Sequence, residues 1–148
     1  MNRNTIHLLL ADDDKDDCLF FKEVLEELPS TINLTIVNDG KQQVEYLVKK
    51  TDNFPTILFI DLNMPRKNGY ECLLEIKKHE KLKQISAIVY STSCDPKMVN
   101  FLYTNGAKCF VQKPFEFSKL KKAVHHALTL NENTNTPQPS KEKFVIQP

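Results

Sequence analysis

The sequence predicts an α/β fold in which a parallel β-sheet carries helices on both faces. Five short apolar runs alternate along the chain with five segments whose apolar residues recur at helical spacing. Strands that alternate with helices pair in parallel and are joined by right-handed crossovers. All three glycines of the chain fall at expected loops or helix ends, so turn chemistry and hydrophobic periodicity agree. The pattern alone does not give the order of the strands.

The first two predicted strands are residues 6–11 and 33–37, which are apolar or β-branched runs. Between them, residues 16–28 predict an amphipathic helix that Pro29 ends. Its apolar stripe consists of Phe21, Val24, Leu25 and Leu28. A turn at residues 38–40 then leads into a short second helix that contains Val44, Leu47 and Val48.

Residues 57–60 form an uninterrupted apolar run, as expected for a central strand that is buried on both faces. Asp95 and Pro96 are suited to cap and to begin a later helix. The remaining elements are a loop at 62–69, a helix at 70–78, a strand at 87–90, a helix from 96 that Gly106 ends, a strand at 109–111 and a helix over 117–128.

The composition is that of a single globular domain. The chain has 148 residues, of which 41% are hydrophobic and 26% charged, and its net charge is +1. This charge gives no reason to expect binding to nucleic acid or to a membrane surface. No apolar run approaches the about 18 residues of a membrane span, and the N-terminus lacks the apolar core of a signal peptide. Four cysteines without metal or disulfide spacing indicate reduced thiols in a cytoplasmic protein.

The composition changes at residue 131, so we expect a folded domain over residues 5–130 and a disordered tail over residues 131–148. Residues 131–143 contain no apolar side chain and are rich in Asn, Thr and Pro. Residues 144–146, with the sequence Phe-Val-Ile, are unusual for a solvated tail. They are either a stray apolar tag or a docking segment that adds to a sheet edge or a groove on a partner.

Polar residues follow four of the predicted strands at the point where each strand ends. Asp12 and Asp13 follow the first strand, Asp61 the third, Ser91 the fourth and Lys113 the fifth. The carboxyl ends of parallel strands meet at one edge of an open α/β sheet, and ligands bind there. We therefore expect these five side chains to form one site.

The residue types of this cluster suit phosphoryl chemistry. Three neighbouring carboxylates repel one another unless a cation neutralises them. Mg²⁺ prefers oxygen ligands and also takes phosphate oxygens, so the cluster predicts a Mg²⁺ site beside a reactive Asp61. A carboxylate in this setting can attack phosphorus and form an aspartyl phosphate. Lys113 would then supply positive charge to the phosphoryl group, and the Ser91 hydroxyl would supply a hydrogen bond.

Each of these residues, taken alone, has a simpler explanation. Lys113 is then a surface lysine, and Ser91 is a hydroxyl at a strand end. We expect Asp14, Asp16 and Asp17 to cap the first helix or to lie on a solvated acidic face, since acids suit a helix N-terminus. Only the joint placement after successive strands makes the cluster specific.

Together these motifs resemble the receiver domain of two-component response regulators over roughly residues 5–130. The resemblance rests on Asp12-Asp13, on Asp61-Leu-Asn-Met-Pro65 with Gly69, on Ser91 and on Lys113-Pro114-Phe115. It implies a flavodoxin-like (βα)5 sandwich with the strand order 2-1-3-4-5. Residues 8–17 and 61–69 are most similar to small single-domain regulators of the phytochrome-associated type.

The resemblance also implies a role for each residue of the cluster. Asp61 is the implied phosphoacceptor, and Lys113 is the implied contact to the phosphoryl group. Asp13 would bind Mg²⁺ directly and Asp12 largely through water. The backbone carbonyl of Asn63 would be a further metal ligand.

Two further positions are implied to form the switch. Ser91 takes the place of the switch Ser/Thr, and Phe110 stands where chemotaxis-type regulators have a switch tyrosine. Phosphorylation is expected to draw Ser91 toward the phosphoryl group and to shift the Phe110 ring. The peptide bond between Lys113 and Pro114 is expected to be cis.

The expected function is that of a stand-alone response regulator rather than of an enzyme. A sensor histidine kinase would phosphorylate Asp61, and the domain would switch a surface that binds a downstream protein; homodimerisation is a further possibility. The alternative is a relay receiver that hands the phosphoryl group to a phosphotransfer protein. A haloacid-dehalogenase-type phosphatase is disfavoured because Asn63 stands where that family has a second Asp. A flavin or nucleotide carrier is disfavoured because the chain has no glycine-rich loop.

Overall fold

A single parallel sheet organises the computed structural model, which describes residues 5–50, 52, 54–64, 66–113, 116–130 and 138–146. The sheet has six strands in the order β2-β1-β3-β4-β5-β6. The strands are β1 (Ile6–Ala11), β2 (Ile32–Val37), β3 (Ile57–Asp61), β4 (Ser86–Ser91), β5 (Cys109–Gln112) and β6 (Val145–Ile146). The flavodoxin-like order 2-1-3-4-5 is therefore confirmed, with one strand added beside β5.

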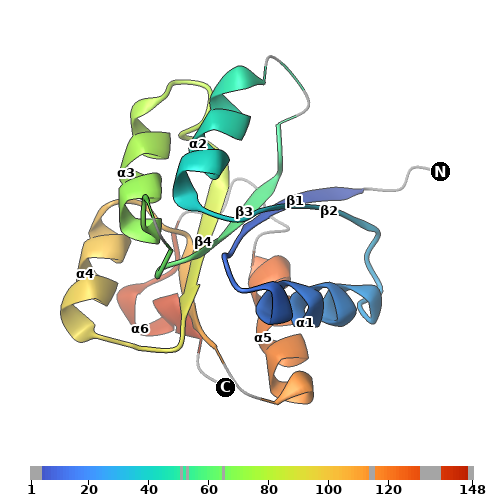
Figure 1. The fold of residues 1–148 in the computed structure, drawn as a ribbon. Helices are drawn as coiled ribbons and strands as arrows, with labels where there is room; N and C mark the ends of the chain where they lie inside the picture. The colour runs from blue at the N-terminus through green and yellow to red at the C-terminus, as the bar shows by residue number, and fades with distance from the viewer. Residues whose placement is uncertain are drawn as a thin grey trace.

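Helices cover both faces of this sheet (Figure 1). They are α1 (Lys15–Glu26), α2 (Gly40–Lys49), α3 (Gly69–Lys78), α4 (Pro96–Thr104), α5 (Phe117–Leu130) and the short α6 (Lys141–Phe144). Helices α1 and α5 lie on one face, and α2, α3 and α4 lie on the other (Figure 1). No helix in the described ranges is long and apolar enough to cross a membrane.

Side chains that accept backbone N–H groups begin α1, α3 and α4. Asp14 caps α1 by accepting from the backbone N–H groups of Asp16 and Asp17, as predicted. Asp95 caps α4 with Pro96 in its first turn, also as predicted. Asn68 and Glu71 form a reciprocal capping box at the start of α3. These caps fix where the loops that follow β1, β3 and β4 end.

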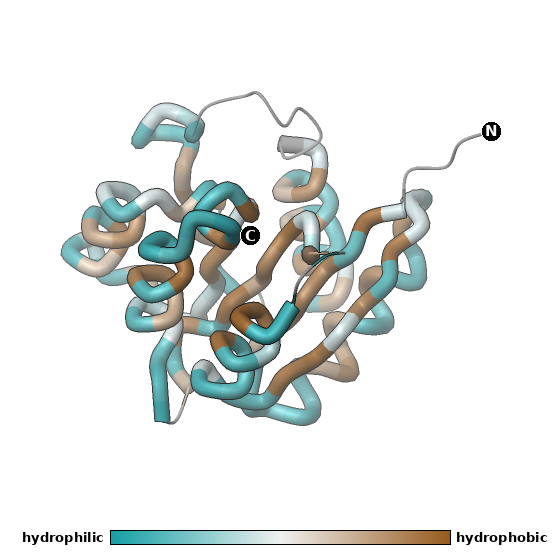
Figure 2. Tube along the Cα trace, turned by 90° about the horizontal axis from the view of Figure 1, so that it is seen from above, coloured by the Kyte–Doolittle hydropathy of each residue, from teal (hydrophilic) through white to brown (hydrophobic). Residues whose placement is uncertain are grey.

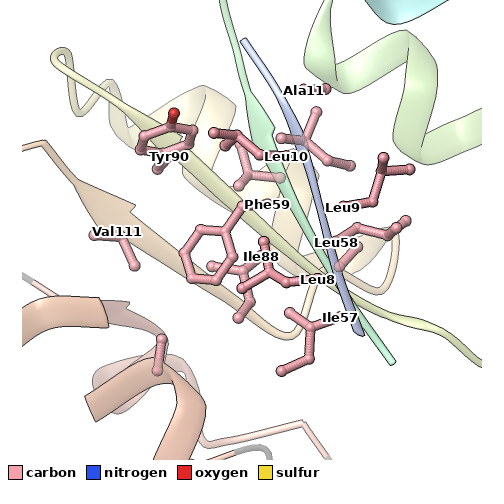
Figure 3. Packing of buried hydrophobic residues seen from close by; sticks show 14 of the residues in the cluster. Leu8, Leu9, Leu10, Ala11, Ile57, Leu58, Phe59, Ile88, Tyr90 and Val111 are labelled. Atoms are coloured by element: carbon pink, nitrogen blue, oxygen red, sulfur yellow. The ribbon is translucent and has the colours of Figure 1, made fainter. Parts of the chain in front are cut away.

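The central strands supply most of the core. All five residues of β3 are buried, which matches the uninterrupted apolar run of the sequence. Figure 2 shows the central strands largely in hydrophobic brown, with hydrophilic teal common on the surrounding helices. On the α1 side of the sheet, the rings of Phe21, Phe59 and Tyr90 pack edge to face or tilted, with centroids 5.0 to 6.0 Å apart. Figure 3 shows Phe59 and Tyr90 among the buried strand residues.

The four cysteines fall into two groups. Cys18, Cys72 and Cys109 are buried free thiols, and Cys94, in the loop between β4 and α4, is half-buried. Burial is the main cause that raises the pKa of each buried thiol to about 12. These three cysteines therefore serve as small core residues.

The expectation of a disordered tail is wrong for residues 138–146. These residues form α6 and β6, and β6 pairs in parallel with β5 through Phe110 with Val145 and Val111 with Ile146. Phe144 is fully buried. The polar composition of residues 131–143 predicts disorder, but the three apolar residues that follow are enough to hold the segment against the domain. The rest of the predicted tail, residues 131–137 and 147–148, lies outside the described residues.

Candidate functional site

The carboxyl edge of the sheet brings the predicted polar residues together. Asp61 and Ser91 are the last residues of β3 and β4, Asp12 follows β1 directly, and Lys113 follows β5 directly. Strands β1 and β4 flank β3. Residues about 100 positions apart in sequence are therefore neighbours: the Lys113 Nζ lies 3.4 Å from an Asp12 oxygen.

Three carboxylates converge at this edge. One oxygen from each of Asp12, Asp13 and Asp61 lies within 4.8 Å of the others. Asp12 is fully buried, Asp61 is 5% exposed and Asp13 is open to solvent. Such a group of hard oxygen donors, with one open side, fits a divalent cation that shares its ligands with water or a phosphoryl group.

Lys113 supplies the positive charge against these carboxylates. Its Nζ donates to Asp17 at 2.8 Å, and lies 3.4 Å from both Asp12 and Asp61. Burial opposes the charged amine, but the hydrogen bond to Asp17 and the charges of Asp61 and Asp12 outweigh burial and raise the pKa of Lys113. One lysine thus faces three carboxylates, which leaves the site short of positive charge.

The shortage of positive charge also affects the pKa of Asp61. Burial raises the pKa of Asp61 to about 7; Lys113 opposes this, and the neighbouring Asp12 adds to it. The backbone N–H of Asn63 donates to the Asp61 carboxylate at 3.2 Å and also favours the ionised form. Added positive charge at the cluster would restore Asp61 to a fully ionised carboxylate at neutral pH.

Tyr90 is a member of the site that the sequence had not predicted. The register pairs Asp61 with Tyr90, so both side chains lie on the α1 side of the sheet. The Tyr90 hydroxyl donates to the Asp12 carboxylate, and Lys113 Nζ lies 4.4 Å from the centre of its ring. Burial and the Asp12 charge raise the pKa of Tyr90 well above its ordinary value, so the hydroxyl remains a donor.

Asp17 is the second residue that the sequence assigned differently. It was expected to lie at the helix start, and it does lie in the first turn of α1. Its carboxylate also forms the shortest of the three ion pairs of Lys113. The direction in which a first-turn residue of α1 faces depends on how the helix packs, and no local signal in the sequence carries it.

Ser91 contacts the loop that follows β3. It is fully buried, and its Oγ lies 3.5 Å from Asn63 Nδ2 and 3.3 Å from Ser93 Oγ. The backbone N–H of Ser93 also donates to the Ser91 hydroxyl at 3.3 Å. The Lys113 N–H donates to the Ser91 carbonyl at 2.8 Å, so the two loops that carry them are joined directly.

Phe110 lies in β5 with its ring buried, 1% exposed, so the structure holds the inward position of this side chain. It is opposite Val89 of β4 on one side and Val145 of β6 on the other. The predicted cis bond between Lys113 and Pro114 involves Pro114, which lies outside the described residues.

Gly69 closes the loop that follows Asp61. Its N–H donates to the Leu62 carbonyl at 2.9 Å. A Cβ at this position would lie 2.6 Å from the Asp61 carbonyl oxygen and 2.8 Å from Leu62 Cα. Only glycine lets the start of α3 approach the end of β3 this closely, which holds the loop of the candidate phosphoacceptor in place.

Comparison with known families agrees with this geometry. The model of the response regulator receiver domain matches residues 8–125. The chain therefore belongs to the response regulator receiver domain family of two-component signalling.

Individual proteins of known families are similar to this chain over most of its length. Response regulator Rcp1 of Synechocystis is 33% identical over 124 residues, which cover 79% of this chain and 82% of Rcp1. The probable methanogenesis regulatory protein FilR2 of Methanothrix harundinacea is 28% identical over 120 residues, which cover 79% of this chain and 77% of FilR2. Both matches span most of this chain and most of the relative.

Two solved structures connect the chain with phytochrome-associated response regulators. The phosphorylated cyanobacterial phytochrome response regulator RcpA superposes with a TM-score of 0.81 at 27% identity, over 92% of this chain and 100% of RcpA. The Mn²⁺-bound form of Rcp1 superposes with a TM-score of 0.78 at 29% identity, over 90% of this chain and 99% of Rcp1. The expected family, fold and subgroup are thus all confirmed.

Proposed function

We propose that this chain is a stand-alone phosphorylation switch in which Asp61 accepts a phosphoryl group from a sensor histidine kinase. The observation that carries the proposal is the approach of Lys113 Nζ to Asp61, at 3.4 Å, within a cluster of three carboxylates. Lysine beside a buried carboxylate neutralises charge that collects on a phosphoryl group during transfer. Membership in the receiver family supports the same chemistry.

The transfer step follows from the position of Asp61. An ionised Asp61 oxygen attacks the phosphorus of a phosphohistidine in line, an O–P bond forms, and the P–N bond breaks with its electron pair leaving on the histidine nitrogen. Lys113 balances charge on the phosphoryl oxygens, while Asp12 and Asp17 keep its amine in place. In the reset step, water attacks phosphorus and the bond from phosphorus to the Asp61 oxygen breaks. The carboxylate is freed, and the phosphoryl group leaves as inorganic phosphate that carries the hydrogens of the water. Asn63 and Ser93 border the path of this water.

The metal ligands are proposed on the donor set. Asp12, Asp13 and Asp61 would hold Mg²⁺, with the backbone carbonyl of Asn63 as a further ligand. When bound, Mg²⁺ supplies the positive charge that the cluster lacks and orients a phosphoryl oxygen. The bound Mn²⁺ of the similar regulator Rcp1 supports a divalent cation at such a site.

The proposed switch links Ser91 to Phe110. A phosphoryl group on Asp61 offers oxygen acceptors to the Ser91 hydroxyl, whose present contacts at 3.3 to 3.5 Å are long. A shift of Ser91 moves the end of β4, which pairs with β5, where Phe110 lies. The phosphoryl group thereby biases two arrangements of the β4–β5 end of the sheet.

Labelling with a small phosphodonor tests the acceptor. The wild-type chain, incubated with acetyl phosphate and Mg²⁺, should gain the mass of one phosphoryl group, and Asp61→Asn should gain none. Asp16→Asn is the matched control, because Asp16 is an exposed aspartate in the first turn of α1, and it should label like the wild type. Wild-type labelling of Asp61→Asn would place the acceptor elsewhere.

A further inference from the structure

The C-terminal segment, residues 138–146, lies on one edge of the sheet and on the flank of α4. Its strand β6 pairs with β5 at two residue pairs, Phe110 with Val145 and Val111 with Ile146. Helix α6 lies beside α4 (Figure 1), and the Phe144 ring packs edge-on against Tyr103 of α4, with centroids 5.1 Å apart. Phe144 is fully buried there, and Ile146 is 8% exposed.

The start of the segment is held by hydrogen bonds from side chains to backbone carbonyls. The Gln138 amide donates to the Tyr103 carbonyl at 2.8 Å and to the Ala107 carbonyl. The Tyr103 hydroxyl donates in turn to the Pro139 carbonyl at 3.2 Å. The Tyr103 carbonyl thus accepts the Gln138 side chain in addition to the Gly106 N–H, which lies at 3.2 Å. Tyr103 contacts the start of the segment through its carbonyl and hydroxyl and the end of the segment through its ring.

The surface beneath the segment has the features of a strand-binding groove. An edge strand offers unpaired N–H and C=O groups along its whole length. Strand β5 has four residues, and β6 pairs with two of them, so Cys109 and Gln112 are without a β6 partner. The Phe144 ring, just before β6, fills an apolar pocket beside Tyr103, and Ile146 of β6 is buried as well.

We propose that the β5 edge and the Tyr103 flank of α4 form a groove that binds an extended apolar strand of a partner protein, and that residues 138–146 occupy this groove in cis. The segment shows which strand fits: it runs parallel to β5, with a branched aliphatic residue at the position of Ile146 and an aromatic residue two positions before it, where Phe144 ends α6. A partner strand that pairs with all four residues of β5 makes more backbone hydrogen bonds than β6 does.

The short tether determines how strongly the resident segment competes with a partner strand for the groove. The segment is joined to α5 by only seven residues, 131–137, so its effective concentration at its own groove is of the order of millimolar. A partner strand therefore has to displace a local competitor, and the groove is closed to weak binders. Lys141, Glu142 and Lys143 are exposed, so selection for the groove rests on the apolar residues that follow.

A peptide competition in the full chain tests the groove. The probe is a fluorescently labelled peptide with the sequence of residues 138–148, and the variant is Phe144→Asp, which places a charge in the pocket and releases the resident segment. Fluorescence anisotropy should show the probe binding at least about tenfold more tightly to Phe144→Asp than to the wild type, because the tethered competitor is gone. Glu142→Gln is the matched control on α6 and should bind the probe like the wild type.

A second variant separates release from misfolding. Gln138→Ala removes the two hydrogen bonds at the start of the segment and leaves the pocket intact, so it should also bind the probe more tightly than the wild type, by a smaller factor. Equal probe binding by the wild type and both variants would overturn the groove. A wild-type dimer in light scattering that Phe144→Asp converts to a monomer would show that the segment serves a second copy instead.

The assay is independent of phosphoryl transfer. The probe should bind Phe144→Asp with the same affinity when Asp61→Asn is added, since the groove consists of β5 and α4 residues only. If Asp61 were not labelled, the proposal of the groove would therefore be unaffected. If the probe did not bind, the proposal that Asp61 is the phosphoacceptor would be unaffected.

Discussion

The Tyr90 hydroxyl donates a hydrogen bond to Asp12, which ties the residue before the candidate switch serine to a candidate metal ligand. The second Asp12 oxygen accepts the backbone N–H of Asp14 at 3.0 Å. Both Asp12 oxygens are thus engaged by the protein itself. Asp12 is thereby held as an anchor of the cluster, while Asp13 remains open to solvent.

Tyr90→Phe should loosen this anchor. Loss of a hydrogen bond to a buried carboxylate is expected to lower the free energy of unfolding by about 1.5–3 kcal/mol without metal. The freed Asp12 oxygen keeps more of its negative charge, so Mg²⁺ should bind about 3–10-fold more tightly, as roughly 1 kcal/mol of added attraction gives. Calorimetric titration with Mg²⁺ and urea unfolding measure the two effects.

Tyr46→Phe, on α2 and away from the site, serves as the control for the loss of a tyrosine hydroxyl. It should change neither the affinity for Mg²⁺ nor, by more than about 0.5 kcal/mol, the stability. Unchanged or weaker Mg²⁺ binding by Tyr90→Phe would mean that Tyr90 does not restrain Asp12 against the metal.

Stability without metal should fall as the pH rises from about 4 to about 7. The pKa of Asp61 is raised from 3.8 to about 7, so the folded chain holds a proton that the unfolded chain releases in this range. A raised carboxyl pKa favours folding below the ordinary value, and this contribution is lost as the pH passes through the folded value. Asp61→Asn should remove this dependence and be more stable than the wild type at pH 8, by on the order of 2–4 kcal/mol.

Urea unfolding from pH 4 to pH 8 in the presence of a chelator measures this difference. Asp95→Asn keeps the α4 cap in an exposed position and controls for the loss of one aspartate. Excess Mg²⁺ should bring the wild type close to Asp61→Asn at pH 8. Parallel pH profiles of the wild type and Asp61→Asn would contradict the raised pKa.

Lys113→Gln should destabilise the chain chiefly at high pH. Removing the lysine leaves buried Asp12 and Asp61 without their counter-charge, which costs about 3–5 kcal/mol when both remain ionised. The pKa of Asp61 should rise further in this variant, because Lys113 lowers it in the wild type. Asp61 should then be protonated at pH 6, so the loss of stability should be smaller there than at pH 8. Unfolding at pH 6 and pH 8 gives the comparison.

Lys97→Gln removes an exposed lysine of α4 and should leave stability unchanged at both pH values. Lys113→Arg keeps a positive charge and should recover most of the loss at pH 8. An equal loss for Lys113→Gln at pH 6 and pH 8 would show that the lysine acts through packing rather than through charge.

Gly69→Ala should disturb the loop after Asp61. Its Cβ would lie 2.6 Å from the backbone oxygen of Asp61, so the start of α3 or the end of β3 must move. We expect a loss of stability of about 1–3 kcal/mol from this overpacking, together with weaker Mg²⁺ binding. Gly106→Ala, at φ +93° after α4, should cost about 1 kcal/mol and leave Mg²⁺ binding intact.

The element map could be predicted because each signal was local. The apolar run at 57–60 became β3, which is buried throughout, and Asp95 caps α4 as its sequence neighbours indicated. The strand order needed the family resemblance, because hydrophobic periodicity carries no information on which strands are neighbours. The cluster of Asp12, Asp61 and Lys113 followed from topology alone, since the ends of parallel strands meet.

What the sequence did not show depends on register and helix rotation. Tyr90 of β4 joins the site because it pairs with Asp61 of the neighbouring strand β3. A shift of β4 by one residue would turn the Tyr90 side chain to the other face of the sheet. Asp17 joins it because α1 packs with that side toward Lys113. The order of residues 138–146 arises from contacts with β5 and α4, which no local composition reports.

The unequal exposure of the cysteines gives this chain a natural position for a reporter dye. Three thiols are shielded and held protonated with pKa values near 12, so a thiol-reactive dye at neutral pH should attach to Cys94 in preference. Cys94 lies three residues after Ser91, in the loop that leads into α4. The fluorescence of an attached dye would follow events at the Ser91 hydroxyl in the unmutated protein.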